Sequence, residues 1–121
     1  MAIPILKQGG VLIASLQAAP TDQDLVRLKD DLAERIGHFR SSGVVIDVSA
    51  LDVMDSIATR TLRGIAQATK LRGADIVIVG IQPEVAFAMV RLGLSLDGIA
   101  TALDLEEGFA CLRPIEVSRG S

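Results

Sequence analysis

Two short apolar runs open the chain and are separated by a turn sequence. Residues 3–7 and 11–17 are mostly apolar, and the Gln-Gly-Gly segment at 8–10 has the length and glycine content of a hairpin connection. The pattern therefore predicts that the chain begins with a β-hairpin.

A long helical pattern follows the hairpin. From Leu25 to Phe39, apolar residues recur at intervals of three and four residues, as they do on the buried face of a helix. Residues 21–24 place a hydroxyl and two carboxylates just before this pattern, which is typical of a helix start. We therefore predict a helix over 21–40 with Thr21 as its N-cap.

Strands and helices alternate along the rest of the chain. The pattern predicts buried strands over 44–48 and 75–80, a helix from just after Asp55 to near Gly73, a helix from Pro83 to Gly93, a short edge strand over 99–103, and a last helix that begins at Asp104 and that Pro114 closes. This order predicts an α/β fold in which a mixed, mainly parallel sheet packs against about four helices, with the strand at 44–48 in the centre. One domain over 1–115 and a flexible tail over 116–121 are expected.

Composition narrows the class of protein. The 121 residues hold 12 Lys and Arg against 15 Asp and Glu, and three Phe are the only aromatic residues, so a basic nucleic-acid surface is not expected. Half of the residues are hydrophobic, yet no run is long enough to cross a membrane. We therefore expect part of the apolar surface to pack against other subunits, as a homodimer or a larger assembly. One cysteine and no leader-like segment fit a cytoplasmic protein.

Motifs of common catalytic sites are absent from the sequence. It has no GxGxxG, GxxxxGK or GxSxG motif and no cluster of His and Cys. His38 is expected at the surface in the last turn of its helix, and Cys111 is expected to be a small buried apolar group. We therefore predict a protein that is not an enzyme and has no cofactor or metal.

The segment between the central strand and the second long helix concentrates polar groups. It contains three carboxylates and two hydroxyls, on Asp47, Ser49, Asp52, Asp55 and Ser56. Sites in open α/β sheets form at the carboxyl ends of strands, and a helix N-terminus offers free N–H groups to a phosphate on Ser56. Alternatively, Asp55 and Ser56 only cap the helix, a contribution of about 1 kcal/mol. Spacing leaves both interpretations open, and capping does not exclude modification.

A polar stripe continues from Ser56 along the predicted helix. Its basic and amide residues recur at helical spacing, at Arg60, Arg63, Gln67 and Lys70. A phosphate on Ser56 would lie one turn from Arg60 and would add about 1.5 to 2 negative charges to the surface. An ordinary solvated helix face would have the same pattern. If the stripe binds a partner, we expect the contacts at Asp55, Ser56, Ile57, Arg60 and Arg63.

Two other function classes use the same carboxylates. In a response-regulator receiver, Asp47 would accept a phosphoryl group, but the chain lacks an acidic pair after its first strands and a lysine after Val79. In a metal-assisted phosphohydrolase, Asp47, Asp52 and Asp55 would bind the cation through oxygen, but neither a general base nor a phosphate loop accompanies them.

Five segments carry a family resemblance: Val-Val-Ile-Asp-Val at 44–48, Met-Asp-Ser at 54–56, Gly-Ile-Gln-Pro-Glu-Val-Ala at 80–86, Leu-Gly-Leu at 92–94 and Thr-Ala-Leu-Asp-Leu at 101–105. With the order of elements, they resemble the STAS domains of anti-anti-sigma factors, and within that family the small scaffold proteins of the bacterial stressosome. The likeness extends from Ile3 to about Leu112. It implies a STAS fold for nearly the whole chain.

The resemblance also implies partners and a phosphorylation site. Proteins of this type assemble with RsbR-like sensor paralogues and hold an RsbT-like switch kinase, which phosphorylates the scaffold and is released; an RsbX-like phosphatase resets it. Ser56 matches the acceptor serine and Asp55 the residue before it, while Thr59 is a second candidate acceptor. Ile57 and Ala58 stand where simpler anti-anti-sigma factors usually have Ser-Gly, which suits the stressosome branch. The alternative is a simple anti-anti-sigma factor that binds an anti-sigma factor kinase directly.

Overall fold

A computed structural model describes residues 3–112 and contains the predicted alternation of strands and helices. In chain order the elements are β1 (Ile5–Gln8), β2 (Val11–Ser15), α1 (Asp22–Phe39), β3 (Gly43–Asp47), α2 (Ser56–Leu71), β4 (Asp75–Val79), α3 (Pro83–Arg91), β5 (Ala100–Ala102) and α4 (Leu105–Leu112). The predicted closing of α4 by Pro114 and the predicted tail at 116–121 lie outside the described residues.

The five strands form one sheet in the order β1-β2-β3-β4-β5. β1 pairs antiparallel with β2, and the other neighbours are parallel. The predicted hairpin, central strand and edge strand are therefore confirmed. The register aligns Ser15 with Asp47, Asp47 with Val79, and Val79 with Ala102. The loops that follow β2 to β5 thus leave the sheet at one edge, which we call the carboxyl edge.

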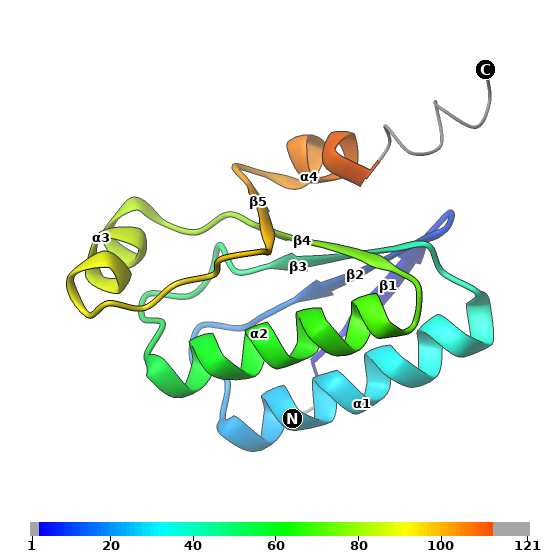
Figure 1. The fold of residues 1–121 in the computed structure, drawn as a ribbon, viewed down its shortest axis with the longest axis horizontal. Coiled ribbons are helices and arrows are strands. Elements are labelled where there is room, and N and C mark those ends of the chain that lie inside the picture. The colour runs from blue at the N-terminus through cyan, green and yellow to red at the C-terminus, as the bar shows by residue number, and fades with distance from the viewer. Residues whose placement is uncertain (1–2, 113–121) are drawn as a thin grey trace.

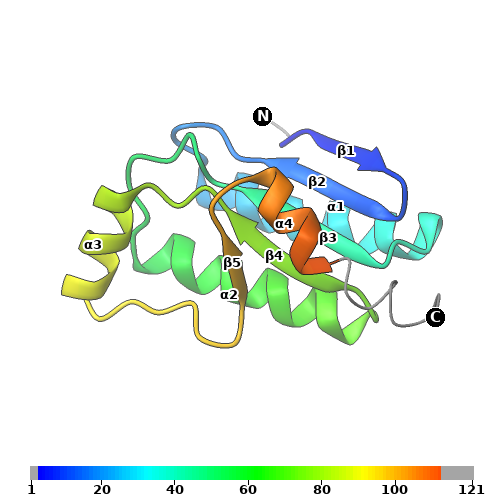
Figure 2. The same ribbon diagram turned by 90° about the horizontal axis from the view of Figure 1, so that it is seen from above.

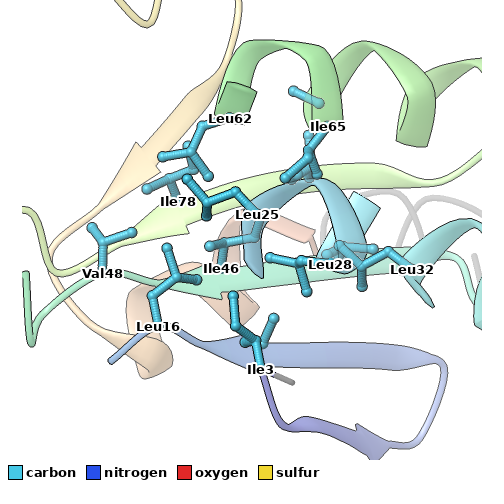
Figure 3. Packing of buried hydrophobic residues seen from close by; sticks show 14 of the residues in the cluster. Ile3, Leu16, Leu25, Leu28, Leu32, Ile46, Val48, Leu62, Ile65 and Ile78 are labelled. Carbon is cyan, nitrogen blue, oxygen red and sulfur yellow. The ribbon is translucent and has the colours of Figure 1, made fainter. Parts of the chain in front are cut away.

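Helices cover the two faces of the sheet unequally. α1 and α2 lie side by side on one face, α4 lies on the other, and α3 lies beyond the carboxyl edge (Figures 1 and 2). Side chains along each central strand alternate between these faces, as the pleat requires. Val44 and Ile46 join the large core against α1 and α2, whereas Val45 packs toward α4. Figure 3 shows the large core, in which Leu25 and Leu28 of α1 and Ile65 of α2 meet the sheet.

The start of α1 agrees with its predicted cap. The Asp24 backbone N–H donates to Thr21 Oγ1 at 3.0 Å, and the Thr21 N–H donates to Asp24 Oδ2 at 2.9 Å. This reciprocal pair is a capping box, with Asp in the place of the usual Glu. Within residues 3–112, no helix is both long enough and apolar enough to span a membrane.

The predicted burial of Cys111, in the last helix, is wrong. Cys111 is exposed, not buried. α4 turns Gly108, Phe109 and Leu112 toward the sheet, and Cys111 lies about 100° around the helix from the middle of that face. Because α4 covers its face of the sheet alone, only a narrow stripe of it is buried. His38 is exposed at the end of α1, as predicted.

Candidate functional site

The loop between β3 and α2, residues 48–55, is held in place by its apolar side chains. Val48, Leu51 and Met54 are each at most 3% exposed and belong to the large core. The Val48 N–H donates to Val79 O at 2.9 Å, which extends the pairing of β3 with β4 by one residue. The polar residues of this loop are therefore presented on a fixed backbone at the carboxyl edge.

Asp55 is the N-cap of α2. Its Oδ1 accepts a hydrogen bond from the Ala58 backbone N–H at 2.8 Å, and its backbone is extended, as is usual at this position. Its backbone oxygen also accepts the Thr59 hydroxyl at 2.8 Å. The capping interpretation is therefore confirmed for Asp55.

Ser56 is the first residue of α2 and is exposed. Its hydroxyl makes no hydrogen bond within residues 3–112. It lies at the N-terminal end of the helix, where backbone N–H groups point outward and the helix dipole is positive. In this position a hydroxyl is accessible to another protein, and a phosphate on it would meet a favourable field.

Thr59, the second candidate acceptor, is in a different environment. It is 0% exposed, and its hydroxyl is already a donor to the Asp55 carbonyl. A kinase would have to unwind the first turn of α2 to reach it. Of the two candidate acceptors, only Ser56 thus has an exposed hydroxyl.

The predicted polar stripe runs along the outer side of α2 from Ser56. Arg60, Gln67 and Lys70 are exposed, whereas Arg63 is half-buried. Lys70 reaches the loop before β5, where its Nζ donates to Gly98 O at 2.9 Å. The end of the stripe nearest Ser56 is thus the part left open to solvent.

Apolar side chains flank Ser56 as well. Ile57 is 47% exposed and Val53, in the preceding loop, is 72% exposed. These two side chains add apolar area to the surface around Ser56 that a partner could cover. The predicted contact residues Asp55, Ser56 and Ile57 are consecutive at the start of α2, and Arg60 follows one turn later.

A groove that the sequence did not reveal lies next to the cap. It has a volume of about 400 Å³ and runs between the loops that follow β2 and β3. Its apolar residues include Leu16, Leu51 and Val53, and it is lined by three carboxylates, Asp22, Asp52 and Asp55. No basic residue is among the described residues that line it. We call it the acidic groove.

Asp47 is the residue that the two alternative function classes share. Asp47 is half-buried, and its Oδ1 accepts the Ser49 backbone N–H at 2.9 Å. In the described part of the chain, no three His, Cys, Asp or Glu residues come close enough together to hold a metal ion. Asp47, Asp52 and Asp55 therefore do not form the ligand set that a metal-assisted phosphohydrolase would need.

Comparison with known proteins identifies the domain family of this chain. The STAS domain model matches residues 2–108. Among curated proteins, the RsbT co-antagonist protein RsbRA of Bacillus subtilis is 30% identical over 82 residues, which are 68% of this chain and 30% of the relative. The chain thus spans about a third of the length of the curated relatives it matches.

Solved structures match over nearly the whole of both chains. A serine-to-glutamate variant of RsbS from Moorella thermoacetica is 36% identical with a TM-score of 0.79, and 97% of each chain is covered. A chain in a solved structure of the stressosome, described as a signal integration and transduction hub, is 37% identical with a TM-score of 0.79. The match covers 93% of this chain and 98% of that one. The predicted resemblance to the stressosome branch, represented by RsbS, is therefore confirmed, and the chain belongs to the STAS-domain family.

Proposed function

We propose that this protein is a non-enzymatic scaffold of a stressosome, which holds an RsbT-like switch kinase and releases it when Ser56 is phosphorylated. The observation that carries the proposal is the contrast at the start of α2, where Ser56 is exposed and Thr59 is 0% exposed and hydrogen-bonded. The kinase transfers the γ-phosphoryl group of ATP to the Ser56 oxygen, the hydroxyl proton is released, and ADP leaves.

The relatives support the choice of partners. One matched structure is RsbS and another is a stressosome chain, while the curated relatives are described as RsbT co-antagonists. We therefore propose that the chain assembles in the cytoplasm with further copies of itself and with RsbR-like paralogues. An RsbX-like phosphatase would hydrolyse the Ser56 phosphoester and restore the binding state.

Charge gives a physical reason for release. Ile57 and Val53 beside Ser56 offer apolar area to the kinase, and the neutral hydroxyl can be covered at low cost. A phosphate adds about 1.5 to 2 negative charges at the same position, next to the carboxylates of the acidic groove. Covering that charge without a partner costs several kcal/mol, and each 1.4 kcal/mol weakens binding about tenfold. Loss of a hundredfold or more in affinity follows without any refolding of the domain.

The proposal is tested by mapping the phosphate and by measuring kinase capture. After incubation with an RsbT-like kinase and ATP, mass spectrometry should place the phosphate on Ser56. Ser56→Ala should retain the kinase in a pull-down, and Ser56→Asp should retain clearly less, although its single charge is an incomplete substitute for a phosphate. Gln8→Glu is the matched control, because it also adds one negative charge, at an exposed residue of β1 whose side chain makes no hydrogen bond within the described residues; it should behave as wild type.

Two outcomes would contradict the proposal. One is recovery of equal amounts of kinase by Ser56→Ala and Ser56→Asp. The other is a phosphate that maps elsewhere, with Ser56 unmodified. If Gln8→Glu loses the kinase as strongly as Ser56→Asp, the effect reflects the net charge of the domain and not the site.

A further inference from the structure

The turn after β4 packs tightly against the β3–α2 loop, although the two are about thirty residues apart in the sequence. Gly80 has φ +82°, and a Cβ there would lie only 2.8 Å from Ser49 Cβ and 3.2 Å from Ser49 Cα. Any larger residue would therefore displace the loop. Gly80 itself is fixed from the other side, because its N–H donates to Ala102 O at 3.1 Å.

Gln82 makes the polar contact across this packing. Its Nε2 donates to Ser49 O at 2.7 Å. Gln82 also occupies the N-cap of α3, where a side chain usually bonds to the helix, but it makes no such bond and Pro83 begins the helix. The amide of Gln82 therefore holds the neighbouring loop instead of its own helix.

Ser49 is consequently held at both of its backbone polar groups. Its N–H donates to Asp47 Oδ1 at 2.9 Å, and its carbonyl accepts from Gln82. Ser49 itself is exposed and has no buried side chain to hold it, unlike Val48 before it and Leu51 after it. Without Gln82, Ser49 would keep only its hydrogen bond to Asp47, beside the packing of its neighbours in the core.

We propose that Gln82 is a positioning residue, which holds the β3–α2 loop in the conformation that presents Ser56 to the kinase. The inference rests on the proposed function. The loop that Gln82 holds supplies Asp52, Val53 and Asp55 to one wall of the acidic groove and ends at the cap of α2. A kinase that docks there meets an ordered surface, so little conformational entropy is lost on binding.

Gln82→Met tests this role, because methionine has a similar length but donates no hydrogen bond and adds no charge. Loss of one partly exposed hydrogen bond should raise the KM of the kinase for the protein roughly two- to tenfold. The kcat should stay within about twofold, since the reacting groups are unchanged once the complex has formed. Gln8→Met is the matched control: Gln8 is exposed in β1, at the far edge of the sheet, and this variant should match wild type.

A second measurement does not depend on the kinase. Hydrogen–deuterium exchange in Gln82→Met should be faster in a peptide that covers 49–53 and unchanged in peptides from α1. Loss of stability throughout the domain would instead accelerate exchange in both regions and leave KM unchanged while the protein stays folded. This readout therefore separates positioning from a general loss of stability.

The outcomes also separate the inference from the proposed function. If wild type is phosphorylated on Ser56 but Gln82→Met has a wild-type KM and wild-type exchange in the loop, the positioning role is wrong and the proposed function stands. If the kinase does not phosphorylate wild type on Ser56, the proposed function fails and the positioning role fails with it. A raised KM in Gln8→Met as large as that in Gln82→Met would likewise overturn the inference.

Discussion

Asp55 is both the N-cap of α2 and a predicted contact residue, and substitution separates the two roles. Asp55→Ala removes the oxygen that accepts the Ala58 N–H at 2.8 Å. Because the site is exposed, water replaces part of this bond, and the loss should be close to the usual cap value of about 1 kcal/mol. Loss of the negative charge at the positive end of the helix adds about 0.3 to 1 kcal/mol. Asp55→Ala should therefore lower the free energy of unfolding by about 1 to 2 kcal/mol in total.

Asp55→Asn separates the contribution of the hydrogen bond from the contribution of the charge. Asparagine caps helices about as well as aspartate, so the hydrogen bond to Ala58 is retained and only the charge contribution is lost. The expected loss is about 0.3 to 1 kcal/mol. Asp52→Ala is the matched control: Asp52 is an exposed carboxylate in the same loop, and it makes no hydrogen bond within the described residues. Its effect should stay within about 0.5 kcal/mol.

Urea unfolding followed by far-UV circular dichroism measures these differences, because the chain has neither Trp nor Tyr to report by fluorescence. Kinase affinity, measured on the same variants, then shows what the carboxylate does. If Asp55 acts through the cap, Asp55→Asn binds the kinase like wild type and Asp55→Ala binds less. If the charge contacts the kinase, both bind less. If Asp55→Ala has the same midpoint urea concentration and the same m-value as wild type, the reasoning about the cap is refuted.

Three further predictions concern the remainder of the fold. Gly108→Ala should destabilise the domain by up to about 2 kcal/mol, because the new methyl would lie 2.6 Å from Val79 Cγ1 and overpacking outweighs the gain in helix propensity. Gly64→Ala in α2 should instead stabilise the domain by about 0.5 to 1 kcal/mol, because the new methyl would have no atom within 4 Å apart from its chain neighbours and the nearby backbone of its own helix. Equal effects of the two substitutions in urea unfolding would contradict both predictions. The Thr21 backbone N–H, together with other contacts, lowers the pKa of Asp24 below its ordinary value of 3.8. Stability from Asp24 is therefore complete above that value and is lost as pH falls through the lowered pKa, so Asp24→Asn should flatten the acid limb of a stability–pH curve at low salt. If the stability of wild type and of Asp24→Asn falls equally steeply at low pH, the contribution of Asp24 is ruled out.

Local patterns predicted most of the fold. The cap at Thr21 and the start of α3 at Pro83 depend on residues within one turn of each other, so the sequence records them directly. β3 and β4 are buried on both faces and appear as continuous apolar runs, which identified them as inner strands. The exposure of Cys111 was not predictable in the same way, because α4 has only eight residues and its periodicity fits more than one buried face.

The parts of the candidate site that are local in sequence were predicted, but the contacts between segments distant in sequence were not. Asp55 and Ser56 were identified because a carboxylate and a hydroxyl precede a helix after a buried strand. The acidic groove and the contact of Gln82 with Ser49 join loops after different strands, and they follow only from the strand order and register. The alignment of β2 with β3 places their following loops side by side, so a correct register would have been the signal for the groove.

The packing of the β3–α2 loop also determines how a modification there can act. Val48, Leu51 and Met54 are in the core, and the first turn of α2 is closed by bonds to Asp55. None of these contacts uses the Ser56 hydroxyl, so a phosphate on that oxygen breaks no interaction that holds the domain together. Phosphorylation should therefore not lower the free energy of unfolding by more than about 1 kcal/mol, since the helix dipole favours the added charge and Asp55 opposes it, and its main effect has to appear in the affinity of a partner. A phosphorylated domain that melts well below the unmodified one would mean that Ser56 acts through the fold instead.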